Sequence, residues 1–164
     1  MFQVNALNLI VGLILLVIFL PILIAGLYGA PWVPIKKSEI GRLNKIIDLK
    51  SNQKFIELGC GDGRVCRYIA QKNPSANIVG IELAWPLFLL SQIKQIISPI
   101  GNLKILMGDC FKLNYSRYDV VYLFLLPKPM KTKLFKRLNN QLKKGSRVIS
   151  YVFPFNEWYG NHVV

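Results

Sequence analysis

The residues best suited to chemistry lie in one acidic, glycine-rich segment, Glu57-Leu58-Gly59-Cys60-Gly61-Asp62-Gly63-Arg64. It follows a short apolar run and precedes a segment with helical periodicity. Glycines let the backbone turn tightly and approach a ligand that side chains would exclude. The first N–H groups of the following helix are free to donate. The segment therefore predicts a ligand-binding loop between a strand and a helix.

Two acidic positions further along the chain strengthen this prediction. Glu82 ends the next apolar run, about 20 residues after the loop, where an acidic side chain can bind both hydroxyls of a ribose. Gly108-Asp109-Cys110 ends the third run, where a short acidic turn can meet the edge of an adenine ring. A ligand with an adenosine group explains all three features. The predicted cofactor residues are Glu57, Gly59, Gly61, Asp62, Gly63, Glu82, Asp109 and Cys110.

The loop discriminates among nucleotide-like cofactors. The NAD fingerprint is G-x-G-x-x-G, but Arg64 occupies the position of its third glycine. Glu57 would also lie close to a pyrophosphate, which is unfavourable. No G-x-x-x-x-G-K-[ST] sequence is present, which excludes a P-loop. S-adenosylmethionine carries an ammonium and a sulfonium but no phosphate, so it suits this acidic loop.

The sequence predicts neither a metal site nor a covalent nucleophile. The three cysteines form no C-x-x-C pair, and His162 is the single histidine, which excludes a structural zinc site and a disulfide scaffold. Methyl transfer from a sulfonium is an in-line displacement that depends on alignment of donor and acceptor. No catalytic residue is assigned. Tyr122, Trp158 and the carbonyls of Leu126 and Pro127 are candidates for orienting an amine.

Strand-like and helix-like segments alternate around these residues. Strands are predicted at 54–58, 78–82, 104–107, 120–125 and 147–152, and helices at 40–47, 64–72, 86–97 and 131–142. Such alternation predicts an α/β fold, a Rossmann-like doubly wound parallel sheet covered on both faces.

The N-terminal part has a different composition. Residues 1–35 contain no Asp, Glu, Lys or Arg. Leu7 to Tyr28 matches the about 20 apolar residues that span a bilayer core. A cleaved signal peptide would need a positive n-region and a shorter apolar core, and the other alternative is a buried hairpin. The chain therefore divides into an anchor with linker, 1–35, and a domain, 36–164.

Charge predicts the orientation and possible partners. Basic residues begin directly after the span, at Lys36 and Lys37, so the positive-inside rule predicts a single-pass protein whose catalytic domain is cytoplasmic. The net charge is +13, and many basic residues lie between Lys128 and Arg147. Anionic lipid headgroups are one possible partner. A nucleic acid is disfavoured because no aromatic platform accompanies the basic residues, and a solvated face is the third alternative.

The loop Glu57 to Arg64, the strand-end Glu82 and Gly108-Asp109 together resemble the class I S-adenosylmethionine-dependent methyltransferases over about residues 55–152. A narrower resemblance rests on the order of an apolar anchor, Gly29-Ala30-Pro31-Trp32-Val33-Pro34, a basic helix, the loop and Phe153-Pro154-Phe155-Asn156-Glu157-Trp158. This order resembles the membrane-anchored protein-lysine methyltransferases that modify the ATP synthase c subunit and the adenine nucleotide translocator. It implies a lysine of a membrane protein as acceptor.

Two features bear on the alternatives. Leu125-Leu126-Pro127 stands where enzymes acting on the planar amino groups of adenine or glutamine often carry [DN]-P-P-[YFW], and its absence counts against that group of substrates. The class also ends with a sixth and a seventh strand, which this sequence is predicted to lack. The alternatives are a methyltransferase of a lipid or lipophilic small molecule, admitted beside the apolar 86–97 helix, and a truncated, non-catalytic module that binds S-adenosylmethionine.

Overall fold

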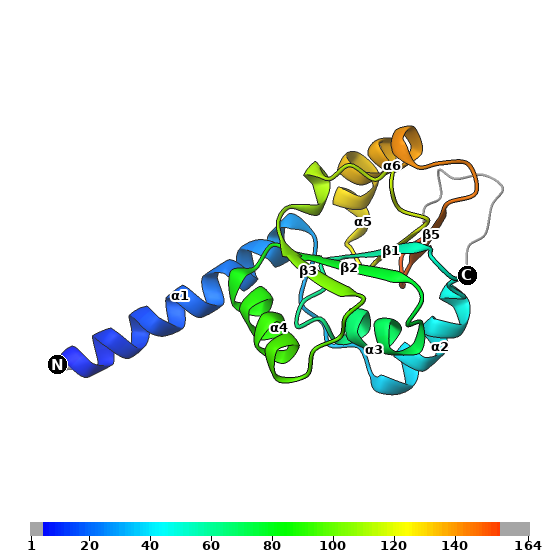
Figure 1. The fold of residues 1–164 in the computed structure, drawn as a ribbon. Helices are drawn as coiled ribbons and strands as arrows, with labels where there is room; N and C mark the ends of the chain where they lie inside the picture. The colour runs from blue at the N-terminus through cyan, green and yellow to red at the C-terminus, as the bar shows by residue number, and fades with distance from the viewer. Residues whose placement is uncertain (1–4, 155–164) are drawn as a thin grey trace.

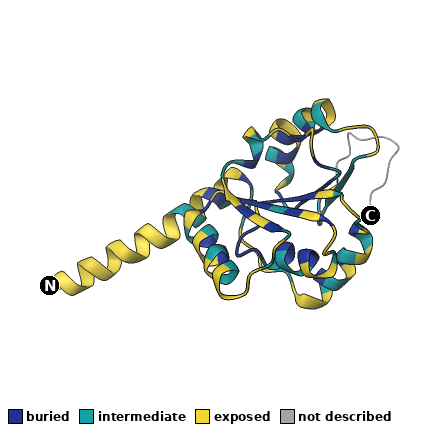
Figure 2. Cartoon of the chain, in the orientation of Figure 1, coloured by how far each residue is buried: buried dark blue, intermediate teal, exposed yellow. Residues whose placement is uncertain are grey.

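A long apolar helix projects from an α/β domain in the computed structural model, which describes residues 5–154 (Figure 1). This helix, α1 (Ala6–Tyr28), is exposed over most of its length (Figure 2), and Ala25 is its one buried residue. It is long and apolar enough to cross a membrane. The predicted apolar span therefore forms one continuous helix, with Pro21 inside it.

The domain is built on a parallel sheet whose strands are β1 (Lys54–Leu58), β2 (Asn77–Glu82), β3 (Leu103–Met107), β4 (Val120–Leu123) and β5 (Arg147–Ser150). Their order is β3-β2-β1-β4-β5, and every neighbouring pair is parallel. This confirms the predicted Rossmann-like fold. The strand order reverses between β1 and β4, and in such sheets ligands bind beyond the carboxyl ends of the strands at that point.

Helices cover both faces of the sheet (Figure 1). One layer contains α2 (Lys37–Ile47), α3 (Arg64–Lys72) and α4 (Trp85–Ile97). The other contains η1 (Cys110–Lys112), α5 (Pro127–Pro129), η2 (Met130–Leu134) and α6 (Phe135–Gln141).

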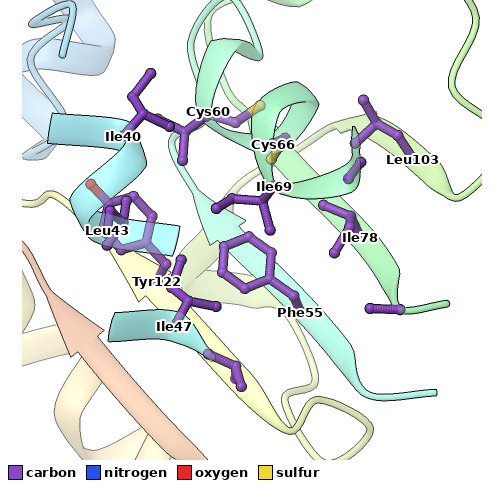
Figure 3. Packing of buried hydrophobic residues seen from close by; sticks show 14 of the residues in the cluster. Ile40, Leu43, Ile47, Phe55, Cys60, Cys66, Ile69, Ile78, Leu103 and Tyr122 are labelled. Atoms are coloured by element: carbon purple, nitrogen blue, oxygen red, sulfur yellow. The ribbon is translucent and has the colours of Figure 1, made fainter. Parts of the chain in front are cut away.

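Alternating side chains of β1 supply both halves of the core. Phe55 packs in the cluster that α2 and α3 cover (Figure 3), and its ring stacks on Tyr122 at 6.5 Å between centroids. Ile56 and Leu58 belong to the cluster on the opposite face. Successive strand residues point to opposite faces, so a strand covered on both sides is buried at successive positions, as β4 is throughout and β1 is from Phe55 to Leu58.

Three predicted boundaries near the site were wrong. Strand β4 ends at Leu123 rather than at 125, and β5 ends at Ser150 rather than at 152. Beyond β4, the Leu126 N–H donates to the Gly29 carbonyl at 2.8 Å, so the linker after α1 draws this segment away from the sheet. The helix predicted at 131–142 begins earlier, because Pro127 occupies a first helical turn, where its fixed φ is favourable.

That helix also contains a π-helical turn, η2, which the periodicity did not predict. The Phe135 N–H donates to the carbonyl of Met130, five residues earlier. The Thr132 hydroxyl donates to the Lys128 carbonyl at 2.9 Å and so competes for a group that a regular helix would use.

Candidate cofactor-binding site

The glycine loop lies between the carboxyl end of β1 and the N-terminus of α3. Gly61 and Gly63 have φ angles of +57° and +73°, in the left-handed region that favours glycine. A Cβ atom at Gly63 would lie 2.7 Å from Ile105 Cδ1, and one at Gly61 would lie 2.9 Å from Trp32 Cδ1. Both positions therefore require glycine for conformation and for space.

Glu82 holds this loop in place from the end of β2. Its Oε2 accepts a hydrogen bond from the Gly61 N–H at 2.7 Å, and its Oε1 accepts one from the Ala84 N–H at 2.8 Å. Burial raises the pKa of this carboxyl, although the backbone N–H groups oppose the shift. Each carboxylate oxygen can accept a further hydrogen bond, so Glu82 can bind a hydroxyl while it holds the loop.

Glu57 is buried beside the loop and faces α3. Its Oε2 accepts hydrogen bonds from the Cys66 N–H at 3.0 Å and from the Cys66 thiol at 2.8 Å. Burial raises the pKa of Glu57 to about 8, and the neighbouring carboxyls of Glu82 and Asp62 add to the rise. The prediction that the first N–H groups of α3 are free was wrong at Cys66, because Glu57 occupies that donor.

Asp62 is buried as well, but it forms ion pairs. Its carboxylate contacts the Arg64 guanidinium at 2.8 Å and the Lys94 ammonium at 2.6 Å. Burial alone would raise the pKa of Asp62, but these two cations outweigh burial and lower it to about 2. No motif in the sequence indicated Lys94, which lies 32 positions away on α4. Asp62 thus fixes the loop to α4.

The five residues Glu57, Gly59, Gly61, Asp62 and Glu82 line one cavity. Gly63 also belongs to the loop, but it packs against Ile105 and does not line the cavity.

The predicted residues at the end of β3 lie apart from this cavity. The Asp109 carboxylate accepts a hydrogen bond from the Phe111 N–H at 2.8 Å and caps η1. It lines a second cleft, together with Tyr28 and Lys133. Cys110 is buried in the core, and its carbonyl accepts a hydrogen bond from the Tyr115 hydroxyl.

The linker after α1 is a part of the site that sequence reasoning missed. Residues 30–35 line the cavity together with the glycine loop. Trp32 is in contact range of Gly61, and a Cβ at Gly59 would lie 3.3 Å from Ala30 Cβ. The two prolines at positions 31 and 34 could have indicated this position, because prolines favour an extended backbone that can lie along the surface of the domain.

Aromatic side chains close the cavity at the ends of β4 and β5. Tyr122 and Phe124 line it, and Phe124 meets the Tyr151 ring edge-on at 5.3 Å and the Phe153 ring at 6.4 Å. Tyr122 is also a core residue. Trp158 and His162 lie outside the described residues.

The cysteines have structural positions. Cys60, Cys66 and Cys110 are unpaired and buried, and burial raises the pKa of the Cys66 thiol well above its ordinary value. Within residues 5–154, no cluster of three or more His, Cys, Asp or Glu side chains could hold a metal ion.

The lining fits a cationic ligand that carries no phosphate. Two buried carboxyls, Glu57 and Glu82, border the loop, and both cations that reach it are paired with Asp62. Phosphate sites instead offer free N–H groups and unpaired basic side chains. S-adenosylmethionine has the required charge, and the glycines allow its close approach to the backbone.

Comparison with known proteins shows the family of the chain. Residues 57–162 match the ANTKMT methyltransferase domain, over more than half of the chain. The chain belongs to this methyltransferase family. It is 31% identical over 134 residues to the human lysine N-methyltransferase of the ATP synthase C subunit, covering 81% of this chain and 56% of that protein. It is 28% identical over 140 residues to a protein-lysine N-methyltransferase of Saccharolobus islandicus (strain REY15A), covering 82% and 83%.

Solved structures of methyltransferases share the fold. An RNA methyltransferase from Salinibacter ruber, crystallised with S-adenosylhomocysteine, superimposes with a TM-score of 0.72 at 29% identity, over 80% of this chain and 86% of that one. A methyltransferase from Thiobacillus denitrificans, also with S-adenosylhomocysteine, has a TM-score of 0.60 at 16% identity, over 72% of this chain and 49% of that one. The cofactor of this family is S-adenosylmethionine, as the loop chemistry predicted.

Proposed function

We propose that this chain is a membrane-anchored methyltransferase that transfers a methyl group from S-adenosylmethionine to a lysine side chain of a membrane protein. The observation that carries this proposal is the shared wall of the site. The segment that leaves α1 lines the same cavity as Glu57, Gly61 and Glu82. An acceptor entering this cavity would therefore approach beside the end of the apolar helix. The relatives named as lysine N-methyltransferases support the choice of acceptor.

The cofactor contributes a methyl group on a positively charged sulfur, and the protein has to position it. Glu82 would bind the ribose hydroxyls, and Glu57 would pair with the ammonium group. Gly59, Gly61 and Gly63 would let the ligand approach the backbone. Asp62 is a positioning residue, because its contacts run to Arg64 and Lys94. Asp109 and Cys110, at the start of η1, are the proposed neighbours of the adenine edge.

A lysine acceptor has to lose a proton before it can attack. Bringing its pKa from about 10.4 to neutral pH corresponds to about 4.6 kcal/mol. Removal from water and the nearby sulfonium charge both lower the pKa of the amine. Tyr122 and Phe124 line the cavity, and Tyr151 packs against Phe124. These aromatic side chains would exclude water and pack against the alkyl chain of the acceptor.

The anchor is proposed to hold the domain on the cytoplasmic side. The 22 residues from Leu7 to Tyr28 give a helix of about 33 Å, close to the thickness of a bilayer core. Basic residues follow the span and none precedes it within the sequence, as the positive-inside rule requires for this orientation.

Methyl-labelled S-adenosylmethionine tests the proposal. The detergent-solubilised full chain is incubated with the label and with membranes from its source, and the products are separated into protein, lipid and RNA. Glu82→Ala is the blank. Label in a protein band, assigned to lysine by mass spectrometry, supports the proposal. Label in lipid or RNA would overturn the choice of acceptor, and cofactor binding without transfer would show a non-catalytic module.

A further inference from the structure

Helix α4 has a large apolar face that nothing in the described chain covers. Ile96 and Ile97 are 78% and 77% exposed. The exposed large apolar residues of this helix are Trp85, Leu89, Leu90, Ile93, Ile96 and Ile97. Successive helical residues turn by about 100°, which places these six in one continuous arc. Leu87 and Ser91, on the other side, are buried in the domain.

The arc contains no charged side chain. Lys94 is the one charged residue of α4, and its ammonium turns toward Asp62 in the glycine loop. Leu83, Leu106 and Met107 at the ends of β2 and β3 are also exposed. Soluble proteins rarely expose large contiguous apolar patches, and such patches mark sites of interaction with proteins or membranes.

The position of α1 indicates what covers this face. Ile22 and Ala25 of α1 pack against Ala84 and Leu87 at the start of α4. In Figure 1, α4 lies at the end of the domain from which α1 projects. The apolar arc therefore belongs to a helix that packs directly against α1, whose own apolar residues are exposed over most of its length (Figure 2).

Two contacts set the depth of α4 along the membrane normal. Ala25, which touches α4, precedes Tyr28 by three residues, or about 4.5 Å of helix. The Lys133 ammonium lies 5.1 Å from the centre of the Tyr28 ring, at the end of the span. If Tyr28 lies at the interface, the start of α4 reaches the edge of the hydrocarbon and Lys133 lies level with the headgroups.

We infer that α4 is an interfacial helix whose apolar arc is buried in the bilayer surface. This inference rests on the proposed membrane anchoring. Interfacial helices bury their apolar face about 5–10 Å into the boundary between headgroups and acyl chains, and the contact at Ala25 places the start of α4 on the membrane side of Tyr28. Because Glu82 and Lys94 join α4 to the glycine loop, seating α4 fixes the orientation of the cofactor loop toward the membrane surface.

Site-directed spin labelling tests the depth directly. The full chain is reconstituted in phosphatidylcholine vesicles with a nitroxide on Ile93→Cys, in the middle of the arc. Gln71→Cys on the exposed side of α3 is the matched control, and Ile14→Cys reports on α1. The native cysteines are buried, and the unsubstituted chain gives their background. Collisions with oxygen and with a water-soluble nickel chelate are compared at each position.

Each outcome decides the question. We expect the nitroxide to collide more often with oxygen than with the chelate at positions 93 and 14, and more often with the chelate at position 71. A label at Ile93 that favours the chelate while Ile14 favours oxygen would overturn the interfacial helix and leave the anchor intact. Chelate preference at both positions would overturn the anchoring proposal itself. Protection of Ile93 only when membrane proteins are added would assign the face to a protein partner and also overturn the inference.

Discussion

The Gly61 N–H donates a hydrogen bond to the Glu82 carboxylate at 2.7 Å, so the acid at the end of β2 supports the glycine loop at the end of β1. The other carboxylate oxygen accepts from the Ala84 N–H, at the start of α4. One buried side chain therefore joins the cofactor loop to the helix inferred to lie on the membrane. Loop geometry and α4 position are thus coupled.

Replacing Glu82 tests this coupling. In Glu82→Ala, two buried N–H groups lose their acceptor, and each orphaned group costs about 1–3 kcal/mol of stability. The ribose hydroxyls would also lose a charged acceptor, which corresponds to a roughly tenfold to hundredfold weaker affinity. Calorimetric titration with S-adenosylmethionine and thermal unfolding measure the two effects. Unchanged affinity in a folded variant would remove Glu82 from the cofactor site.

Gly61→Ala should disturb the loop in two separable ways. A non-glycine residue in the left-handed region costs about 1–2 kcal/mol, and the added Cβ would lie 2.9 Å from Trp32 Cδ1. The double variant Gly61→Ala/Trp32→Ala should recover only the stability that is lost through the contact with Trp32, and not the cost of the left-handed backbone. Gly101→Ala is the matched control, because a Cβ there meets nothing within 4 Å and no positive φ is involved. Denaturant unfolding of these variants and of the unsubstituted protein checks the prediction.

The protonation of Glu57 should make cofactor binding depend on pH. Burial raises its pKa to about 8, so a cationic ligand that pairs with the carboxylate has to displace a proton below that pH. Affinity for S-adenosylmethionine should therefore increase from pH 6 to pH 8, by up to about tenfold per unit. Titrations across this range measure it. In Glu57→Gln the dependence should shrink to that of the ligand's own amine, and an identical slope in both proteins would exclude Glu57.

The same group predicts a stability change of known sign. A folded pKa raised from 4.5 to about 8 means that the folded state holds the proton more tightly than the unfolded chain. Its contribution to stability is therefore complete below pH 4.5 and is lost as the pH rises through 8. Relative to Glu57→Gln, the unsubstituted protein should lose free energy of unfolding between pH 5 and pH 9. Urea unfolding at both ends of this window measures the difference.

The pKa of Asp62 predicts the opposite dependence of stability on pH. Its pKa is lowered from 3.8 to about 2, so its contribution is present above pH 4 and is lost as the pH falls toward 2. Asp62→Asn should cost about 1–3 kcal/mol near neutral pH, because the charged hydrogen bonds to Arg64 and Lys94 are weakened. The difference in free energy of unfolding between the unsubstituted protein and Asp62→Asn should become smaller as the pH falls toward 2. Asp48→Asn is the control, because the Asp48 carboxylate is also paired with a lysine, Lys50, which lowers its pKa, but the pair is exposed to solvent. It should change stability much less than Asp62→Asn.

Local signals in the chain were sufficient to predict the elements and the composition of the loop. The predicted bounds of β1 and α3 agree with the structure. Gly63, at the start of α3, and Asn73-Pro74, at its end, are start and stop signals that act on their immediate neighbours. The apolar runs that became β2 and β4 were equally clear, because a strand buried on both faces needs apolar side chains at successive positions.

How these elements meet depended on packing between distant segments. The pairing of Asp62 with Lys94, the position of Trp32 against Gly61 and the packing of Ala25 on α4 join residues about 30 to 60 positions apart. Periodicity reports which face of an element is apolar, but it does not report which other element covers that face. The exposed arc of α4 shows this limit most clearly. Its apolar residues predicted a helix, and only the burial of Leu87 and Ser91 against the rest of the domain showed that the arc faces away from the core.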